Sequence, residues 1–383
     1  MEEIYKKLDT IRDVWNYNIW DYPYCQSEIK FDKEAKTNYF GDLMGYFHDT
    51  LDMLKEPVSS NALTGVFSYH VSLLQTLYVQ QDFIDELLRL FATGFNKGDL
   101  KKDVNYSINR EIRNELVGHP IRRDKTGKLV SSTLFSYDSH HGKIEYLRYH
   151  QEKNFEFETV KYNVEDILNR HTIFLNTWLD IIIEKLKSVV NKHKSELTKI
   201  KDKVYIIKFE SLVCLLDQKY KPFLENTYLY EKDSILKIYE KRSVHRRYRI
   251  VYEQFIDDLV SSLNEQINSC EEVFTRRFIV YDNKTSNLKP LFNIDEDGVI
   301  HIDLPIKKRN LGRPKKDYNY PLQKLIDSSR RNYMDFNFFS GSILSQCKNK
   351  IVERELNRMR QYLNDDIEYI SSYRLICKIL KTH

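Results

Sequence analysis

The chain has few residues that interrupt helices and few cysteines. Its 383 residues include only 11 Gly, 8 Pro and 5 Cys. This scarcity favours helices, because Gly and Pro fit a helix interior least well. The cysteines are scattered singly and form no C-x-x-C pair, which predicts neither a zinc site nor a disulfide framework. Reduced thiols of a cytoplasmic protein fit this pattern best.

Two further absences limit what the chain binds. No uncharged apolar run approaches the ~18 residues of a membrane helix, and the acidic start at residues 1–4 lacks the core of a signal peptide. We therefore expect a cytoplasmic protein that does not contact a membrane. The net charge is only +4, so a nucleic-acid surface would have to come from local clusters of basic residues.

Apolar side chains recur at helical spacing over the first half of the chain. They predict helices at residues 36–55, 66–92, 104–118 and 164–190. Asn163 can cap the last of these helices. The aromatic stretch at residues 1–35 predicts an irregular arm that packs on them.

A strand-like segment separates the last two of these helices. Residues 130–137 and 143–149 flank a loop that contains Gly, which predicts a β-hairpin, and residues 155–159 can add a third strand. With this insert at residues 129–160, the order of elements is that of a four-helix bundle. We therefore expect a first domain at residues 1–190, mainly α in class, with a β-hairpin insert.

Residues 191–383 predict a second, mainly helical domain, which would regulate the first or hold RNA. A small hairpin is expected within residues 277–304, around an Asp-Gly turn. Residues 192–203 are expected to form a lysine-rich linker or an exposed helix, and residues 307–316 a basic loop. Helical stretches are expected at residues 204–275, 320–333 and 340–380.

One heptapeptide at the end of the third predicted helix combines a permanent cation with a titratable imidazole. It reads Arg113-Asn114-Glu115-Leu116-Val117-Gly118-His119 and is followed by Pro120. Arg binds phosphate through a planar fork of donors, and a His with a pKa near about 6.5 can move protons at neutral pH. Of the eleven histidines, only His119 has an Arg five to seven residues before it. The simpler interpretation is a surface Arg and a capping His at a helix C-terminus, where a cation is favoured.

The heptapeptide resembles the Arg-x(4–6)-His motif of the HEPN superfamily (higher eukaryotes and prokaryotes nucleotide-binding), in the form that has Asn after the Arg. Residues 73–82 are similar to the long second helix of its bacterial members, and the resemblance covers roughly residues 35–190. It implies a four-helix bundle and a metal-independent endoribonuclease without a cofactor. Its role would be in phage defence or as a toxin, with an antitoxin or a trigger as partner.

The resemblance also implies a role for each motif residue. His119 would take the proton of the ribose 2′-hydroxyl or protonate the leaving 5′-oxygen, and Arg113 would stabilise the charge on the phosphate. Asn114 would orient His119 or bind the phosphate. The products would carry a 2′,3′-cyclic phosphate and a 5′-hydroxyl. Members of the superfamily typically build this site from two motifs across a homodimer interface.

Helix geometry bears on the same point. Six residues at ~100° each place Arg113 and His119 about 120° apart on an ideal helix. Either the backbone turns at Gly118, or a two-fold homodimer brings two motifs into one composite site. The apolar side of residues 66–92 or of residues 164–190 would then supply the contact between the subunits.

Further polar residues near the motif are candidates for binding RNA. One arginine lies a helical turn before Arg113, and two follow the motif. Three polar residues, 80–82, interrupt an apolar helix and form either a solvated face or part of a cleft. The candidates for contact with RNA are Arg110, Arg122, Arg123, Gln81 and Asp82.

Two basic segments support alternatives. Residues 241–249 place Tyr248 among basic residues, which could hold phosphates and stack bases or form a solvated helix face. Residues 307–316 contain a Gly-Arg-Pro sequence similar to the core of an AT-hook, but Leu311 stands where that motif has Arg, which favours an ordinary basic loop. There are two alternatives to a nuclease. The first is a non-catalytic HEPN-like protein, which would bind RNA or a nucleotide, or act as the scaffold of a defence complex. The second is a DNA-binding accessory factor.

Overall fold

The computed structural model of the chain divides into two compact units, and each is described by itself. The first unit comprises Met1–Asp202, Gln218–Pro222 and Leu263–Thr275, and the second comprises Lys203–Asp217, Phe223–Ser262 and Arg276–His383. The structure describes residues 1–55, 62–96, 98–135, 140–225, 230–275, 292–294, 300–302, 318–327 and 331–381.

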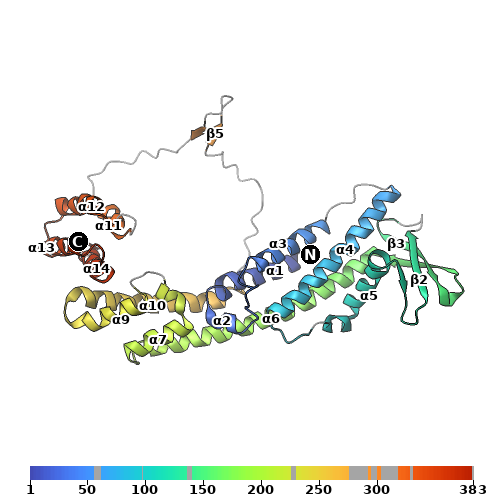
Figure 1. Ribbon diagram of the computed structural model, residues 1–383, viewed down its shortest axis with the longest axis horizontal. Coiled ribbons are helices and arrows are strands. Elements are labelled where there is room, and N and C mark those ends of the chain that lie inside the picture. The colour runs from blue at the N-terminus through green and yellow to red at the C-terminus, as the bar shows by residue number, and fades with distance from the viewer. Residues whose placement is uncertain are drawn as a thin grey trace. The chain divides into compact units, whose positions relative to one another are not determined.

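Helices that follow the apolar spacing build the first unit (Figure 1). They are α1 (Glu2–Val14), α2 (Pro23–Ser27), α3 (Tyr39–Met53), α4 (Leu63–Leu90), α5 (Val104–Arg113) and α6 (Val164–Lys203). Asp103 caps α5 by accepting from the backbone N–H groups of Asn105 and Tyr106. Asn163 caps α6 by accepting from the N–H of Glu165 at 3.1 Å. The expected mainly α class and the four helices predicted for this region are confirmed.

An apolar cluster fixes α5 against its neighbours. α4 contributes Leu73, Leu74 and Leu77, α5 contributes Ile112 and α6 contributes Ile167, and each of these is 4% exposed or less. Burying a Leu or Ile side chain stabilises a fold by about 1.5–3 kcal/mol. The position of α5, which carries the Arg–His motif, is therefore set by core packing.

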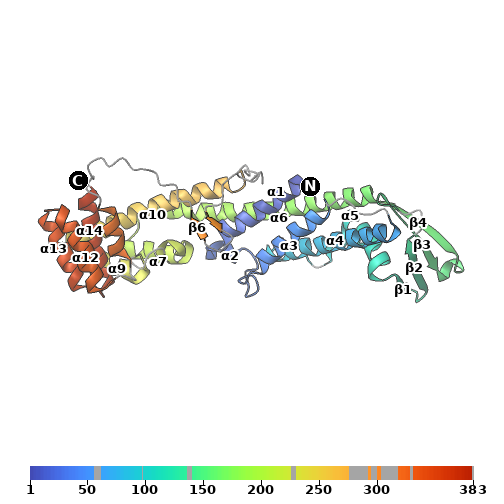
Figure 2. The same ribbon diagram turned by 90° about the horizontal axis from the view of Figure 1, so that it is seen from above.

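A four-stranded antiparallel sheet lies at one end of these helices (Figure 2). Its strands are β1 (Ile121–Arg123), β2 (Leu129–Phe135), β3 (Lys143–His150) and β4 (Phe157–Asn163), in the order β1-β2-β3-β4. The expected hairpin and third strand are confirmed. β1 was not predicted, because three residues are too few for alternation to show. Ile144 and Tyr146 of β3 are fully buried in the cluster that α4 and α5 form, so sheet and helices share one core.

The N-terminal segment is helical, so the irregular arm expected at residues 1–35 is wrong. Trp15–Ile19 extend α1 as a π-helical turn, and α2 begins at Pro23. The expected packing is confirmed, since Nζ of Lys7 lies 2.8 Å from Asp180 of α6. The abundance of aromatic residues obscured the helical spacing of one buried stripe. This stripe on α1 consists of Ile4, Leu8, Ile11 and Val14.

α6 continues past its expected end at residue 190. Its buried side includes His193 and Ile200, so residues 192–203 are neither a linker nor a fully exposed helix. The expected domain boundary falls inside this helix, and the first unit extends to Asp202. Although α6 is 40 residues long, neither it nor any other described helix is apolar enough to cross a membrane.

The second half of the chain is also mainly helical, with one small hairpin. In the second unit, the rings of Phe209, Phe223 and Tyr230 pack around Phe255 at centroid distances of 5.5, 5.3 and 5.2 Å. The basic loop expected at residues 307–316 lies outside the described residues. The helices are α7 (Phe209–Lys219), α8 (Lys221–Glu225), α9 (Lys232–Glu240), α10 (Arg246–Glu272), α11 (Asn319–Ile326), α12 (Tyr333–Gln346), α13 (Lys350–Gln361) and α14 (Asp366–Lys381), and β5 (Phe292–Ile294) pairs with β6 (Ile300–Ile302).

Candidate active site

The Arg–His motif forms the end of α5 and the turn that follows it. α5 ends at Arg113, and Asn114–Gly118 continue as a π-helical turn. The backbone N–H of His119 donates to the carbonyl of Asn114 at 2.6 Å, which is the five-residue spacing of a π turn. The angle between Arg113 and His119 on an ideal helix therefore does not apply. The backbone departs from the ideal helix inside the motif itself.

Arg113 is held by neutral partners. Its Nε and Nη2 donate to Oε1 of Gln75 at 3.2 and 2.9 Å, and its Nη1 donates to Oδ1 of Asn114 at 3.2 Å. Its guanidinium carbon lies 3.8 Å from the ring centre of Tyr78. These bonds use three of the five N–H donors of an arginine, and no described carboxylate forms a salt bridge with it. The guanidinium is oriented while its charge stays uncompensated.

Gly118 allows Arg113 to lie next to His119. A Cβ placed on Gly118 would lie 2.6 Å from Nη1 of Arg113, which is closer than real Cβ contacts come. A side chain at residue 118 would therefore require the end of the Arg113 side chain to move. The end of the Arg113 side chain thus lies against the residue that directly precedes His119. The His119 side chain is exposed, so a ligand can reach it.

A second arginine shares the same aromatic ring. The guanidinium carbon of Arg110 lies 3.5 Å from the ring centre of Tyr78, and its Nη1 donates to Oδ1 of Asp82 at 2.8 Å. Asp82 therefore compensates the charge of Arg110, whereas Arg113 has no such partner among the described residues. Asp82 is half-exposed, so the structure places it within reach of a ligand together with Arg110.

The polar residues 80–82 do not form the solvated face that was one expectation. Gln80 and Gln81 are at most 1% exposed. Nε2 of His171 bonds to Oε1 of Gln80 at 2.7 Å, and Gln81 donates to the carbonyl of Tyr106 at 3.1 Å. These bonds tie α4 to α6 and α5. Gln81 is too buried to contact RNA directly, which corrects the expectation for this residue.

The sheet anchors the motif through Glu115. Arg148 of β3 donates to its two carboxylate oxygens at 2.6 and 2.8 Å, and Ser132 of β2 donates its hydroxyl at 2.7 Å. Burial alone would raise the pKa of Glu115, but the bonds from Arg148 and Ser132 outweigh burial, so the pKa lies below its usual value. The carboxylate stays charged and holds the turn against the sheet.

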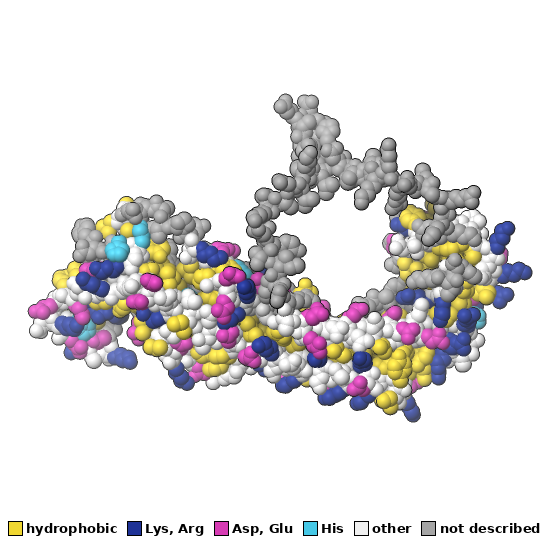
Figure 3. Space-filling model, turned by 180° about the vertical axis from the view of Figure 1, so that it is seen from behind, with side chains coloured by type: hydrophobic (Ala, Val, Ile, Leu, Met, Phe, Trp, Pro, Cys, Tyr) yellow, Lys and Arg dark blue, Asp and Glu magenta, His cyan; other side chains and the backbone are white. Residues whose placement is uncertain are grey.

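The two arginines after the motif have different surroundings. Nη2 of Arg122 lies 3.7 Å from Glu115, so Arg122 belongs to the anchor and its charge is compensated. Arg123 is exposed and donates through Nη1 to the carbonyl of Gly127 at 2.9 Å. Over the described surface in view in Figure 3, Lys and Arg stand among Asp and Glu, without a field of one sign.

One group of side chains in the sheet has the composition of a metal site. Ligand atoms of Asp124, His150 and Glu152 lie within 4.8 Å of one another. Each already has a protein partner, since Nε2 of His150 lies 3.2 Å from Asp124 and Nζ of Lys128 lies 2.9 Å from Glu152. A cation would have to replace these contacts, so we assign no metal to this group.

Arg247 and Tyr248 of the basic segment 241–249 are buried, whereas Arg246 and Arg249 are exposed. Arg247 is 5% exposed, and its Nη2 lies 3.3 Å from Glu368. Lys241 and the hydroxyl of Tyr248 also donate to Glu368, at 3.0 and 2.5 Å. Burial raises the pKa of Glu368, but the bonds from Tyr248, Arg358 and Lys241 prevail and lower it to about 2. Arg247 also lies 3.9 Å from Glu355, so two carboxylates lie among these basic side chains.

Sequence reasoning missed Gln75, Tyr78 and the partner of Glu115. Gln75, Tyr78 and Asp82 recur three and four residues apart on one side of α4, which is a polar stripe that helical spacing could have revealed. The bond between Glu115 and Arg148 has no local signal, because 33 positions separate them in the chain.

Comparison with known proteins found no relative of this chain. No protein-family model, no curated protein and no solved structure matches the chain. A functional proposal therefore rests on two things, the contacts of the Arg–His motif and the resemblance of its residues to the HEPN motif.

Proposed function

We propose that this protein is a metal-independent endoribonuclease of the HEPN type, which acts in the cytoplasm in phage defence or as a toxin under the control of an antitoxin or a trigger. One observation carries the proposal. Arg113 is oriented by neutral partners, keeps its charge, and lies against Gly118 directly before the exposed His119. A preorganised, uncompensated donor suits a site where negative charge develops.

The two motif groups would divide the reaction between them. His119 takes the proton of a ribose 2′-hydroxyl, whose oxygen attacks the adjacent phosphorus while the bond to the 5′-oxygen breaks. Arg113 stabilises the added charge on the phosphate with the two N–H donors that its described partners leave. A protonated His then donates to the leaving 5′-oxygen. The products are a 2′,3′-cyclic phosphate and a 5′-hydroxyl.

This reaction needs a base and an acid, and one subunit offers a single His119. A two-fold homodimer would supply the second group from its partner. The apolar sides of residues 66–92 and 164–190, expected as the contact, are buried inside the bundle, so another surface must serve. Ile121 lies in the edge strand β1, two residues after His119, and is 67% exposed, which makes it a better-placed contact.

A cleavage assay tests the proposal. The full chain is incubated with a 5′-labelled single-stranded RNA in excess EDTA, and the product ends are analysed. We expect cleavage that survives the chelator and leaves 2′,3′-cyclic phosphates. Activity that EDTA abolishes and Mg²⁺ restores would contradict the mechanism.

Two further outcomes would favour the alternatives. RNA binding without cleavage under any condition would favour a non-catalytic HEPN-like binding or scaffold protein. Preference for duplex DNA over single-stranded RNA in competition would favour a DNA-binding accessory factor. Among the cations of segment 241–249, the buried Arg247 is occupied by Glu368, so it is not available to phosphates.

A further inference from the structure

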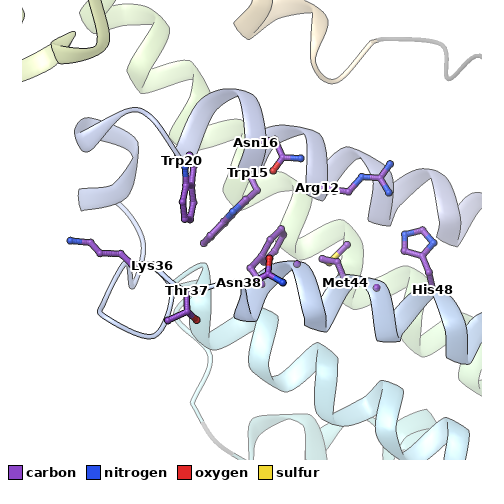
Figure 4. Close-up of a pocket in the computed structure, with 12 residues that line it drawn as sticks. Arg12, Trp15, Asn16, Trp20, Lys36, Thr37, Asn38, Met44 and His48 are labelled. Atoms are coloured by element: carbon purple, nitrogen blue, oxygen red, sulfur yellow. The ribbon is translucent and has the colours of Figure 1, made fainter. Parts of the chain in front are cut away.

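A second candidate site lies in the N-terminal part of the first unit, in residues that the motif does not use. A cavity of about 740 Å³ opens between the segment that follows α1 and helix α3. Figure 4 shows Trp15 and Trp20 side by side at one end, near Lys36, with Arg12 and His48 toward the other end. This volume is within the range of small-molecule sites, about 300–1,000 Å³.

Two glycines of α3 keep one wall of this cavity open. Gly41 and Gly45 line it one helical turn apart, and neither is among the described glycines with a positive φ. A Cβ on Gly45 would meet nothing within 4 Å, and a Cβ on Gly41 would meet only the Asn38 side chain. At Gly45, therefore, neither backbone geometry nor packing requires glycine, although glycine weakens a helix relative to alanine, whereas a Cβ on Gly41 would lie 2.9 Å from Oδ1 of Asn38. What their small size provides is open space along this wall of the cavity.

The lining combines aromatic rings with cations and contains no carboxylate. One face of Trp15 is stacked on Phe40 at 4.1 Å, whereas Trp20 is 44% exposed and has ring surface available. Asp9 already compensates Arg12 at 2.6 Å. Lys36 forms no salt bridge with a described residue and lies 5.9 Å from the ring centre of Phe31. An exposed indole and an ammonium without a described salt bridge line the same end of the cavity, which suits a ligand that has a planar ring and a separate negatively charged group.

We propose that this cavity binds a nucleoside phosphate, whose base stacks on Trp20 and whose phosphate pairs with Lys36. The same chemistry is offered by a free nucleotide and by one nucleotide of a single-stranded RNA, and the test separates these two sources. The site uses none of the motif residues, so it does not depend on the proposed nuclease activity.

Tryptophan fluorescence provides a direct measurement, because two of the three tryptophans of the chain line the cavity. The full-length His119→Ala variant, which cannot degrade the probe by the proposed route, is titrated with ATP, with AMP and with a short single-stranded RNA. We expect saturable quenching by at least one probe, and loss of most of it in Trp20→Phe. Lys36→Gln should weaken binding about tenfold, whereas Lys33→Gln, an exposed lysine of the same loop that does not line the cavity, should bind normally.

Gly45→Leu is the decisive variant. It adds a side chain to the cavity wall at a position where a Cβ meets no atom within 4 Å, and leucine favours a helix more than glycine does, so the variant should fold and melt about 2 °C higher than the parent. We expect equilibrium dialysis with labelled probe to show no binding to this variant. Quenching by ATP or AMP identifies a free nucleotide as ligand, and quenching by RNA alone identifies an RNA nucleotide. Absence of binding by all three probes, or undiminished binding in Gly45→Leu, would overturn the proposal.

Discussion

Arg113 lies in the Arg–His motif and Arg247 in the basic segment 241–249, and their partners carry different charges. Arg113 contacts the amide oxygen of Gln75 and the ring of Tyr78. Arg247 lies 3.9 and 3.3 Å from the carboxylates of Glu355 and Glu368. An arginine between carboxylates is neutralised and serves the fold, whereas an arginine held by neutral groups keeps its charge for an anion. The two segments thus differ in the sign of the partners around their arginines, which the density of basic residues along the chain does not show.

The largest expected effect is the loss of cleavage when either motif group is removed. His119→Ala should slow RNA cleavage about 10³-fold because it removes the proton carrier, and Arg113→Ala should slow it about 10²–10³-fold. Arg113→Lys should recover little, since an ammonium lacks the planar fork of donors. Single-turnover cleavage measures the effect, and the exposed Lys125→Ala serves as a control with the parent rate. A parent rate in His119→Ala would remove the nuclease assignment.

The matching substitution in the basic segment 241–249 should lower the stability of the fold and leave cleavage chemistry aside. Arg247→Ala leaves buried carboxylates without one partner and should lower the free energy of unfolding by about 3 kcal/mol. The exposed Arg249→Ala, which loses only a helical pair with Glu253 at 3.5 Å, should change it by less than about 0.5 kcal/mol. Urea unfolding distinguishes the two. Equal stability of both variants would show that the carboxylates around Arg247 do not depend on it.

The two units should also lose stability in different ranges of pH. In the first unit, burial lowers the pKa of His171 from 6.5 to about 3, so the unfolded chain binds this proton more readily and stability falls as the pH drops below about 6.5. In the second unit, the pKa of Glu368 is lowered from 4.5 to about 2, so its contribution is lost only below about pH 4.5.

Urea unfolding at pH 7 and pH 5.5 measures this difference. The His171 contribution should lower the free energy of unfolding by about 1.4 kcal/mol for one pH unit below 6.5. His171→Gln should reduce this dependence by about that amount, because an amide binds no proton in that range, while His70 and His193, whose pKa values burial also lowers to about 4, keep their contributions. A pH dependence that persists unchanged in His171→Gln would assign the proton to another buried group.

The smallest effect expected here comes from giving Arg113 the kind of partner that Arg247 has. Gln75→Glu keeps the size of the side chain and places a carboxylate at 2.9–3.2 Å from the guanidinium. Cleavage should fall about tenfold, equivalent to about 1.4 kcal/mol in the barrier, while the fold should be as stable as before. Gln361→Glu adds the same charge in α13 and should leave cleavage unchanged. Unchanged cleavage in Gln75→Glu would show that the neutrality of the partner is not what matters.

Much of the fold could be predicted because helical and strand spacing are local properties. The apolar residues of α4 and α6 recur every three or four positions, and the strands on either side of the loop near Gly142 alternate, so helices and hairpin were found. α1 was missed because aromatic residues crowd the segment that follows it. The break expected at residue 190 was suggested by lysines that lie on the exposed side of α6, while His193 and Ile200 are buried on the other side.

By itself, the sequence determined the order of the helices and strands, the capping of α6 by Asn163, and the residue types of the motif from Arg113 to His119. These follow from the identity and spacing of neighbours along the chain. Only the tertiary structure decided that Arg113 is uncompensated and that Arg247 is neutralised. Compensation depends on which groups meet in space, and the groups that settle it are distant in sequence, 38 positions between Gln75 and Arg113 and 121 between Arg247 and Glu368. Electrostatic interactions weaken with distance in space, not with separation along the chain, so no local pattern could have distinguished the two arginines.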